Sequence, residues 1–136
     1  MSDPSSDDPE TPYARLGGEP AVRALVERFY DAMDAGEPAL AALHHREDNK
    51  VSRASRDRFA SFLIGWLGGP DDYVRAYGHP RLRQRHAHVP VDTAMRDAWL
   101  RCMARALDVV EAPPDARHFL EARLTEVADF LRNRSG

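Results

Sequence analysis

The chain has 136 residues and a mass of 15.3 kDa, and 43% of its residues are hydrophobic. This length suits one domain with one hydrophobic core. The mean hydropathy is -0.57 and no apolar run approaches the ~20 residues that a membrane span needs, which excludes a transmembrane helix. The net charge of -3 comes from four carboxylates in residues 1–12, so residues 13–136 carry a net charge of +1, without the concentrated basic face that nucleic-acid binding needs.

The first twelve residues, MSDPSSDDPETP, contain serine, proline and acid but no apolar stretch. This composition predicts a disordered acidic tail over residues 1–12 and a single domain over residues 13–136. Because the tail lacks the apolar segment of a signal peptide, we expect a cytoplasmic protein. The single cysteine, Cys102, excludes an internal disulfide, and its apolar neighbours predict a buried core thiol.

Four stretches repeat apolar residues with the period of an amphipathic helix, and no alternating stretch supports a sheet, so we expect an all-α fold. The first helix begins near Pro20 and ends at Gly36, and the second ends at Gly68. The third is N-capped by Asp92, and the fourth follows Pro114. The predicted inward faces are Val22, Leu25, Val26, Phe29 and Met33; Phe59, Phe62, Leu63, Trp66 and Leu67; Met95, Trp99, Cys102, Met103, Ala106 and Val110; and Phe119 or Leu120 with Leu124, Val127 and Leu131.

Two connections between these helices are irregular. Residues 40–52 contain HHREDNK, which is too polar for more than a short helical turn and indicates a surface connection or the lip of a cavity. Residues 70–91 are interrupted by prolines and can hold only short helical pieces. A plain helical bundle has short loops and does not need so long a segment, which indicates a functional loop or disorder.

Within the second connection, PRLRQRHAH is the segment that could carry chemistry. If it forms a short helix, Leu82 and His86 share one face and Arg81 and Arg85 share the next. An inward imidazole beside a leucine, with arginines at the rim, is what a haem requires. An arginine-rich helix with a solvated histidine, and a basic patch that binds phosphate or RNA, are the alternative interpretations. Three further polar side chains are candidates for the same rim: Tyr73, Tyr77 and His79.

Three segments together resemble one known family over roughly residues 13–131. They are YARLGGEPAVRALVERFYDAM at 13–33, FLIGWLGGPDDYVRAYGHPRLRQRH at 62–86, and RDAWLRCM at 96–103. The spacing of WLGGP, YGHPRLRxRH and RDAWL is typical of the truncated haemoglobins of group II. This resemblance implies a two-over-two helical sandwich around a haem.

The resemblance also implies roles for individual residues. It implies haem b with His86 as the proximal iron ligand, and it places Tyr30 and Trp99 as hydrogen-bond donors in the distal pocket. Ser55 and Phe59 would lie over the iron on the distal helix. The implied haem-binding residues are Phe62, Tyr73, Tyr77, His79, Leu82, Arg83, Arg85 and Val91.

At two positions the sequence departs from the family pattern. His44 stands where many relatives carry tyrosine or phenylalanine, and three alternatives stay open for it: a pocket residue, a sixth iron ligand when no external ligand is bound, or a solvent-exposed side chain. We expect its neighbour His45 to point outward. Val89 replaces a phenylalanine of the family, which indicates looser haem packing on the proximal side.

We therefore hypothesise a globin that reversibly binds O2, CO and NO as a monomer or homodimer. Tyr30 and Trp99 each carry a polar hydrogen, and a buried hydroxyl without a partner costs about 1 to 3 kcal/mol. Two donors aimed at a bound ligand favour slow O2 release and redox chemistry with oxygen, NO or peroxide, which would require an external electron donor or reductase. If both instead bond backbone carbonyls, they are ordinary core aromatics. The alternative function is a cofactor-free helical interaction module that uses Arg81, Arg83 and Arg85.

Overall fold

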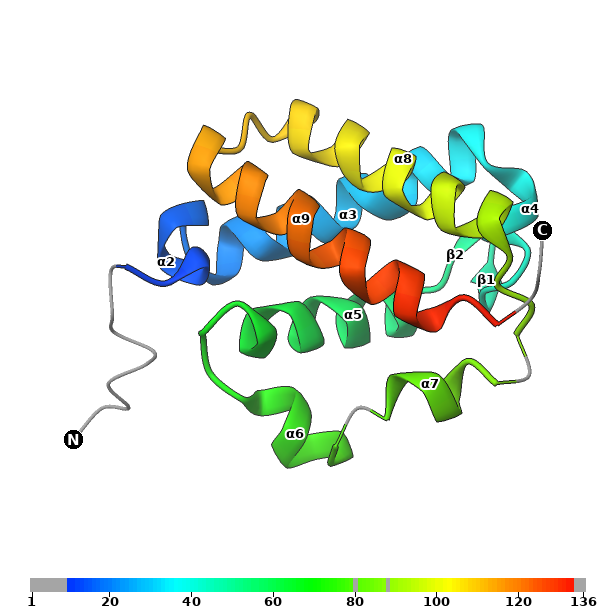
Figure 1. The fold of residues 1–136 in the computed structure, drawn as a ribbon, viewed down its shortest axis with the longest axis horizontal. Coiled ribbons are helices and arrows are strands. Elements are labelled where there is room, and N and C mark those ends of the chain that lie inside the picture. The colour runs from blue at the N-terminus through cyan, green and yellow to red at the C-terminus, as the bar shows by residue number, and fades with distance from the viewer. Residues whose placement is uncertain (1–9, 80, 88, 134–136) are drawn as a thin grey trace.

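The computed structural model describes residues 10–79, 81–87 and 89–133, without the side chains of Arg83 and Arg85. The prediction of an all-α fold is confirmed (Figure 1). The helices are α2 (Pro12–Leu16), α3 (Glu19–Gly36), α4 (Pro38–Ala41), α5 (Arg53–Trp66), α6 (Asp72–Tyr77), α7 (Leu82–Arg85), α8 (Thr93–Val109) and α9 (Pro114–Leu131). Of the predicted tail, Thr11 caps α2 by accepting a hydrogen bond from the Ala14 amide, and residues 1–9 lie outside the described residues.

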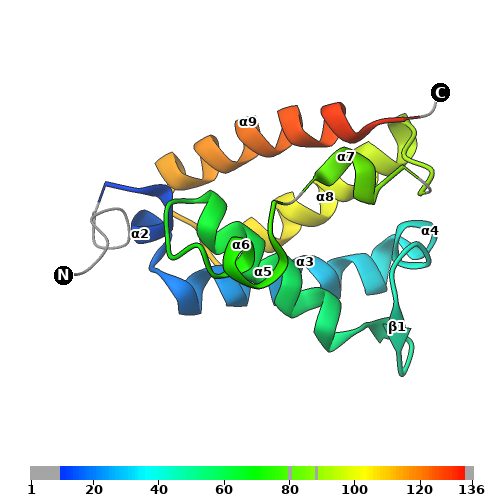
Figure 2. The same ribbon diagram turned by 90° about the horizontal axis from the view of Figure 1, so that it is seen from below.

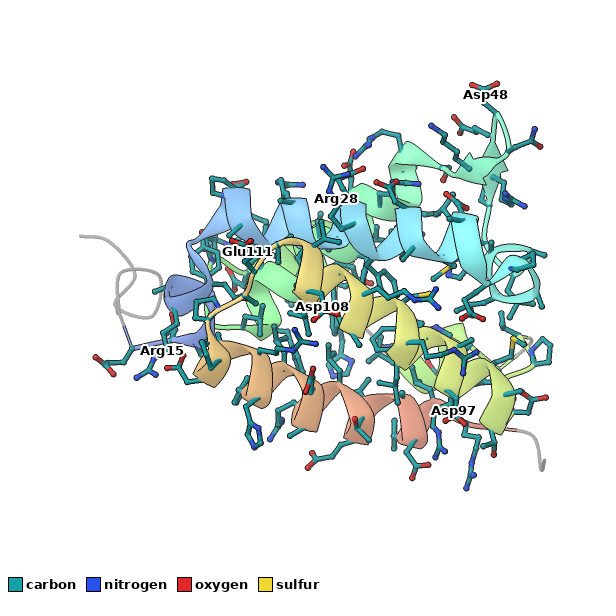
Figure 3. All side chains as sticks on the ribbon, turned by 90° about the horizontal axis from the view of Figure 1, so that it is seen from above. Arg15, Arg28, Asp48, Asp97, Asp108 and Glu111 are labelled. Carbon is teal, nitrogen blue, oxygen red and sulfur yellow. The ribbon has the colours of Figure 1, made fainter. Side chains whose placement is uncertain are left out.

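Four long helices form two pairs that pack across each other. Helix α3 packs against α5 in one pair and α8 against α9 in the other, and α3 also packs on α8. Helices α8 and α9 run antiparallel beside each other and are joined by a short loop (Figures 1 and 3). The pairs lie around one core, which contains Phe29, Leu25, Met103 and Leu107, all at most 2% exposed. This is the two-over-two arrangement that the family resemblance implies.

Local sequence signals fix where these helices begin and end. The Ser52 hydroxyl accepts a hydrogen bond from the Ser55 amide at the start of α5, and the Asp92 carboxylate accepts one from the Met95 amide at the start of α8. Gly68 takes a φ of 103° just after α5, a conformation that side chains rarely adopt. On α9 the sequence left two alternatives open, and Leu120 is buried while Phe119 is 40% exposed. Cys102 is fully buried, as predicted, and burial raises the pKa of its thiol to about 11.

The expectation that no part of the chain forms a sheet is wrong in one place. The first connection contains a small antiparallel hairpin. Strand β1 (Arg46–Glu47) pairs with β2 (Lys50–Val51) across a two-residue turn. The turn residues Asp48 and Asn49 have φ values of 54° and 64°, which aspartate and asparagine tolerate better than most residues and which match a type I′ turn. Figure 3 shows Asp48 at the tip of this hairpin. The strands are too short to show the alternation by which strands are recognised in a sequence.

The proline-interrupted segment after α5 forms two short helices, as predicted. Helix α6 packs against α5, and α7 lies below the gap between α5 and α9 (Figures 1 and 2). Helices α6 and α7 therefore form one wall beside the two helix pairs.

In the described part of the chain, no helix is both long and apolar enough to cross a membrane.

Candidate functional site

A cavity of about 560 Å³ lies between this wall and the two helix pairs. Its size is within the usual range of small-molecule and cofactor pockets, and its wall is mostly aromatic and aliphatic with a few polar groups. The lining residues are Tyr30, Leu40, Leu43, His44, Ser55, Arg58, Phe59, Phe62, Tyr73, Leu82, His86, Val89, Val91, Met95, Arg96, Trp99, Leu124, Val127, Ala128 and Leu131. This combination of a few polar groups with a largely apolar wall makes the cavity the candidate site.

The proximal candidate, His86, follows the last turn of α7 and is half-buried in the cavity wall. Its Nδ1 lies 2.7 Å from the carbonyl oxygen of Leu82. A carbonyl oxygen only accepts hydrogen bonds, so in the neutral ring the proton lies on Nδ1 and Nε2 keeps a free lone pair. A metal-binding histidine is commonly oriented in this way, with its second nitrogen donating to a carbonyl.

Asn133, just beyond α9, holds the loop that carries His86. Its side-chain amide donates to the carbonyl oxygens of His86 at 3.0 Å and Val89 at 2.9 Å. The Val91 amide donates to its side-chain oxygen at 2.9 Å, and the Asn133 amide donates to the Val91 carbonyl at 2.8 Å. Asn133 was not predicted as a site residue, because nothing local in the sequence signals a contact with a loop so far away in the chain.

On the opposite side of the cavity, Tyr30 and His44 lie together. Their ring centroids are 5.6 Å apart in an edge-on arrangement. Tyr30 is 5% exposed, and burial raises the pKa of its phenol, so the hydroxyl stays protonated and can donate. The Nδ1 of His44 lies 3.0 Å from the Leu40 carbonyl oxygen, which leaves its Nε2 unprotonated in the neutral ring. Burial lowers the pKa of His44, opposed in part by the hydrogen bond to the Leu40 carbonyl, so its imidazole is neutral at pH 7.

An aromatic group covers the rest of this side. The Trp99 ring meets Phe29 edge-on at 5.1 Å and Phe59 at 6.1 Å, and Phe59 stacks on Phe62 at 6.5 Å. These distances are those of favourable aromatic pairs, which hold the indole and phenol rings in fixed orientations. The hydroxyl of Ser55, one turn before Phe59 on α5, accepts a hydrogen bond from the Ser52 hydroxyl at 3.0 Å.

Arg56, which was not singled out from the sequence, packs against the Tyr30 ring. Its side chain is 5% exposed, and its guanidinium lies 5.7 Å from the centroid of the Tyr30 ring. It donates to Asp31 at 2.9 Å, to Asp34 at 2.9 Å and to Glu27 at 3.0 Å. A second hollow of about 360 Å³ beside it is lined mainly by charged groups, so it lacks the apolar wall of a cofactor pocket.

The structure brings most of the predicted site residues into one cavity wall: His86, His44, Tyr30, Trp99, Ser55, Phe59, Phe62, Tyr73, Leu82 and Val91. It places Tyr77 and His79 outside that wall, with Tyr77 47% exposed and the His79 Nδ1 accepting a hydrogen bond from the Arg81 amide. The side chains of Arg83 and Arg85 lie outside the described residues. His45 points outward, with a side chain that is 71% exposed.

The lining fits a haem in its donor chemistry. One wall offers an imidazole nitrogen with a free lone pair, and the remaining wall is largely aromatic and aliphatic. Two guanidinium groups that the sequence analysis missed, Arg58 and Arg96, also line the cavity and could pair with carboxylates of a cofactor. Arg96 is already paired with Asp129 at 2.8 Å and Asp97 at 3.1 Å.

Comparison with known proteins agrees with this arrangement. A sequence model of the family "Bacterial-like globin" matches residues 11–133. The group 2 truncated hemoglobin YjbI of Bacillus subtilis is 35% identical over 91% of this chain and 89% of its own. Among solved structures, the cold-adapted truncated hemoglobin of Pseudoalteromonas haloplanktis TAC125 is 38% identical with a TM-score of 0.84, covering 92% of this chain and 99% of that one.

The group II 2-on-2 hemoglobin of Agrobacterium tumefaciens is 36% identical with a TM-score of 0.84 and covers 100% of both chains. The family match and these relatives extend over nearly all of the described residues. Membership of this family implies a haem that binds a gas ligand. The chain belongs to the bacterial-like globins and, within them, to the group II truncated haemoglobins.

Proposed function

We propose that this chain binds haem b in the cavity through the Nε2 atom of His86 and reversibly binds O2, CO and NO. The observation that carries the proposal is the His86 imidazole in the cavity wall, with Nδ1 committed to the Leu82 carbonyl. When bound, the haem supplies a ferrous iron with a coordination position for a diatomic ligand. The chain would supply the nitrogen ligand of His86, the apolar wall and the polar groups around the bound gas.

On the proximal side, the role of the chain is to present one nitrogen lone pair. A hydrogen bond from Nδ1 to a carbonyl fixes the tautomer and makes Nε2 a stronger donor to a metal. The four hydrogen bonds of Asn133 hold the backbone that follows His86. Both interactions keep the imidazole oriented toward the cavity before a haem enters.

On the distal side, Tyr30 and Trp99 would donate hydrogen bonds to the bound ligand. The indole N–H is a donor only, and the buried phenol keeps its proton. Oriented donors in a water-poor site stabilise a ligand that gains negative charge, as O2 does on ferrous iron. We therefore propose slow O2 release. A solved relative from Bacillus subtilis, 34% identical with a TM-score of 0.82, is described as oxygen-avid.

His44 would shape the same pocket. Its neutral ring offers an Nε2 lone pair, which can accept a hydrogen bond from Tyr30 or serve as a sixth iron ligand when no external ligand is present. With bound oxygen, NO or peroxide held among Tyr30, His44 and Trp99, we also propose redox chemistry in this pocket. That chemistry requires electrons from an external donor.

Titration of the purified chain with haemin, followed by absorption spectra of the ferric, ferrous and CO-bound forms, tests the proposal. We expect one equivalent of haem to bind, a sharp Soret band, and reversible band shifts when O2 or CO is added to the ferrous protein. A correctly folded chain that leaves haemin unbound would contradict the proposed function.

A further inference from the structure

Two tyrosines connect the cavity to the protein surface. Tyr73 lines the cavity and is 5% exposed, whereas Tyr77, the last residue of α6, is 47% exposed. Their ring centroids are 4.9 Å apart, so the rings are in contact. Since Tyr77 lies outside the cavity wall, the proposed gas binding gives this contact no role.

The two phenols are suited to carry an electron from the surface to the cavity. Electron transfer between aromatic rings in contact is fast, and a phenol is far easier to oxidise than a phenyl ring. Oxidation of a phenol at neutral pH also requires loss of its proton, because its radical cation is a strong acid. Tyr77 can give this proton to bulk water, and the partly open surface around it lets a donor molecule approach.

In the described part of the chain, the other oxidisable rings of the cavity wall, Tyr30 and Trp99, contact no second tyrosine or tryptophan ring. Tyr30 is buried, and burial holds its proton on the phenol. Its ring neighbours are Phe29, Phe59 and His44. In the described part of the chain, the ring contacts of Trp99 are with Phe29 and Phe59, which are poor electron carriers. The Tyr73–Tyr77 pair is therefore the direct tyrosine path from this cavity to solvent.

We propose that Tyr73 and Tyr77 form an electron path by which a haem in the cavity, reducing a peroxide, oxidises small phenolic donors at the protein surface. The inference rests on the proposed function, because it requires haem in the cavity. It adds the site of substrate oxidation and the class of substrate. A donor that docks at Tyr77 does not need to enter the cavity.

The reaction balances with phenols as the reductant. Reduction of one hydrogen peroxide breaks the O–O bond, takes up two electrons and two protons, and forms two water molecules. Each electron leaves Tyr77 by way of Tyr73, and the Tyr77 phenol gives its proton to bulk water. Each tyrosyl radical then recovers one hydrogen atom from a donor phenol. Two donor molecules become phenoxyl radicals for each peroxide consumed.

Arg58 lies at the junction of the cavity and this surface. Its guanidinium is 5.4 Å from the centroid of the Tyr77 ring, and Arg58 also lines the cavity. A cation over the ring disfavours a positively charged ring, so oxidation of Tyr77 is coupled to loss of the phenol proton. The expected product is therefore a neutral tyrosyl radical, which electron paramagnetic resonance identifies by its spectrum.

The test begins with the haem-loaded protein and a measurement of haem content by the pyridine haemochrome. Failure to load haem overturns the proposed function itself. The loaded ferric protein is then mixed with one equivalent of hydrogen peroxide, frozen rapidly for electron paramagnetic resonance, and in parallel treated with a nitroso spin trap and digested for mass spectrometry. We expect a tyrosyl signal and a trap adduct on Tyr77.

Three variants, each normalised to its haem content, separate the path from its alternatives. Tyr77→Phe should lose the adduct at this position and slow the oxidation of a phenolic donor. Tyr73→Phe should lose the adduct on Tyr77 although Tyr77 is still present. Tyr13→Phe, the control on α2 outside the cavity wall, should match the unmodified protein. An adduct mainly on Tyr30 or Trp99, no radical in the loaded protein, or an undiminished Tyr77 adduct in Tyr73→Phe would overturn the inference.

Discussion

Replacement of Tyr30 by phenylalanine isolates the contribution of one hydroxyl to oxygen binding. The phenyl ring keeps the packing against Phe29 at 4.9 Å and Phe59 at 5.9 Å, so the substitution removes the donor and little else. A hydrogen bond to a partly charged acceptor contributes about 1.5 kcal/mol, which corresponds to roughly a tenfold change in a rate constant. We therefore expect O2 to dissociate from Tyr30→Phe roughly tenfold faster than from the unmodified protein.

Stopped-flow replacement of bound O2 by CO measures this rate directly. Bound CO carries little negative charge, so its own dissociation should change much less than that of O2. Tyr13→Phe serves as the matched control, because it removes a phenol on α2 away from the cavity wall. An O2 dissociation rate that Tyr30→Phe leaves unchanged would refute the argument that this hydroxyl donates to the ligand.

Three further outcomes follow from the structure. His44→Leu should alter the ferric absorption spectrum and the affinity for azide, whereas His45→Leu, at an exposed position, should not; identical spectra for both would place His44 outside the pocket. Asn133→Ala removes three side-chain hydrogen bonds from the loop after His86 and should speed the transfer of haem to apomyoglobin, and an unchanged transfer rate would refute this support. The hydrogen bond from Arg53, opposed in part by burial, lowers the pKa of Glu27 below 4.5 in the folded protein. The ionised Glu27 therefore stabilises the fold above pH 4.5, and this stabilisation is lost as the pH falls through the pKa of Glu27 in the folded protein. Urea unfolding of Glu27→Gln between pH 6 and pH 3 should therefore show a weaker loss of stability with acid than the unmodified protein, and equal slopes would contradict it.

The long helices could be predicted because each carries its own signal. The inward faces of α3 and α8 repeat with the helical period, and their ends coincide with glycine, proline and a capping aspartate. The hairpin could not be predicted, since two strands of two residues are too short for any alternation. Its turn depends on Asp48 and Asn49 adopting positive φ, for which a polar pair in a loop is only a weak indication.

The cavity was harder to predict than the helices around it. Leu124, Val127 and Leu131 follow the inward face of α9, but the helical period does not distinguish a residue that fills the core from one that faces a hollow. Arg58 and Asn133 act through partners far away in the sequence, and polar residues near helix ends usually face solvent. His86 was a candidate from the PRLRQRHAH segment alone. Tyr30 and Trp99 were assigned to the distal pocket only because the family resemblance supplied a spacing that the residues alone do not impose.

The proposed function depends on a bond from the Nε2 atom of His86 to the haem iron. His86→Gly removes this nitrogen, and haem retention and the ferrous spectrum are measured with and without added imidazole. The substitution opens space at the cavity wall, and free imidazole can occupy it. We expect weak haem retention and an altered spectrum without imidazole, both restored when imidazole is added, while the exposed control His118→Gly behaves as the unmodified protein. Full haem retention with an unchanged ferrous spectrum in His86→Gly would contradict the account.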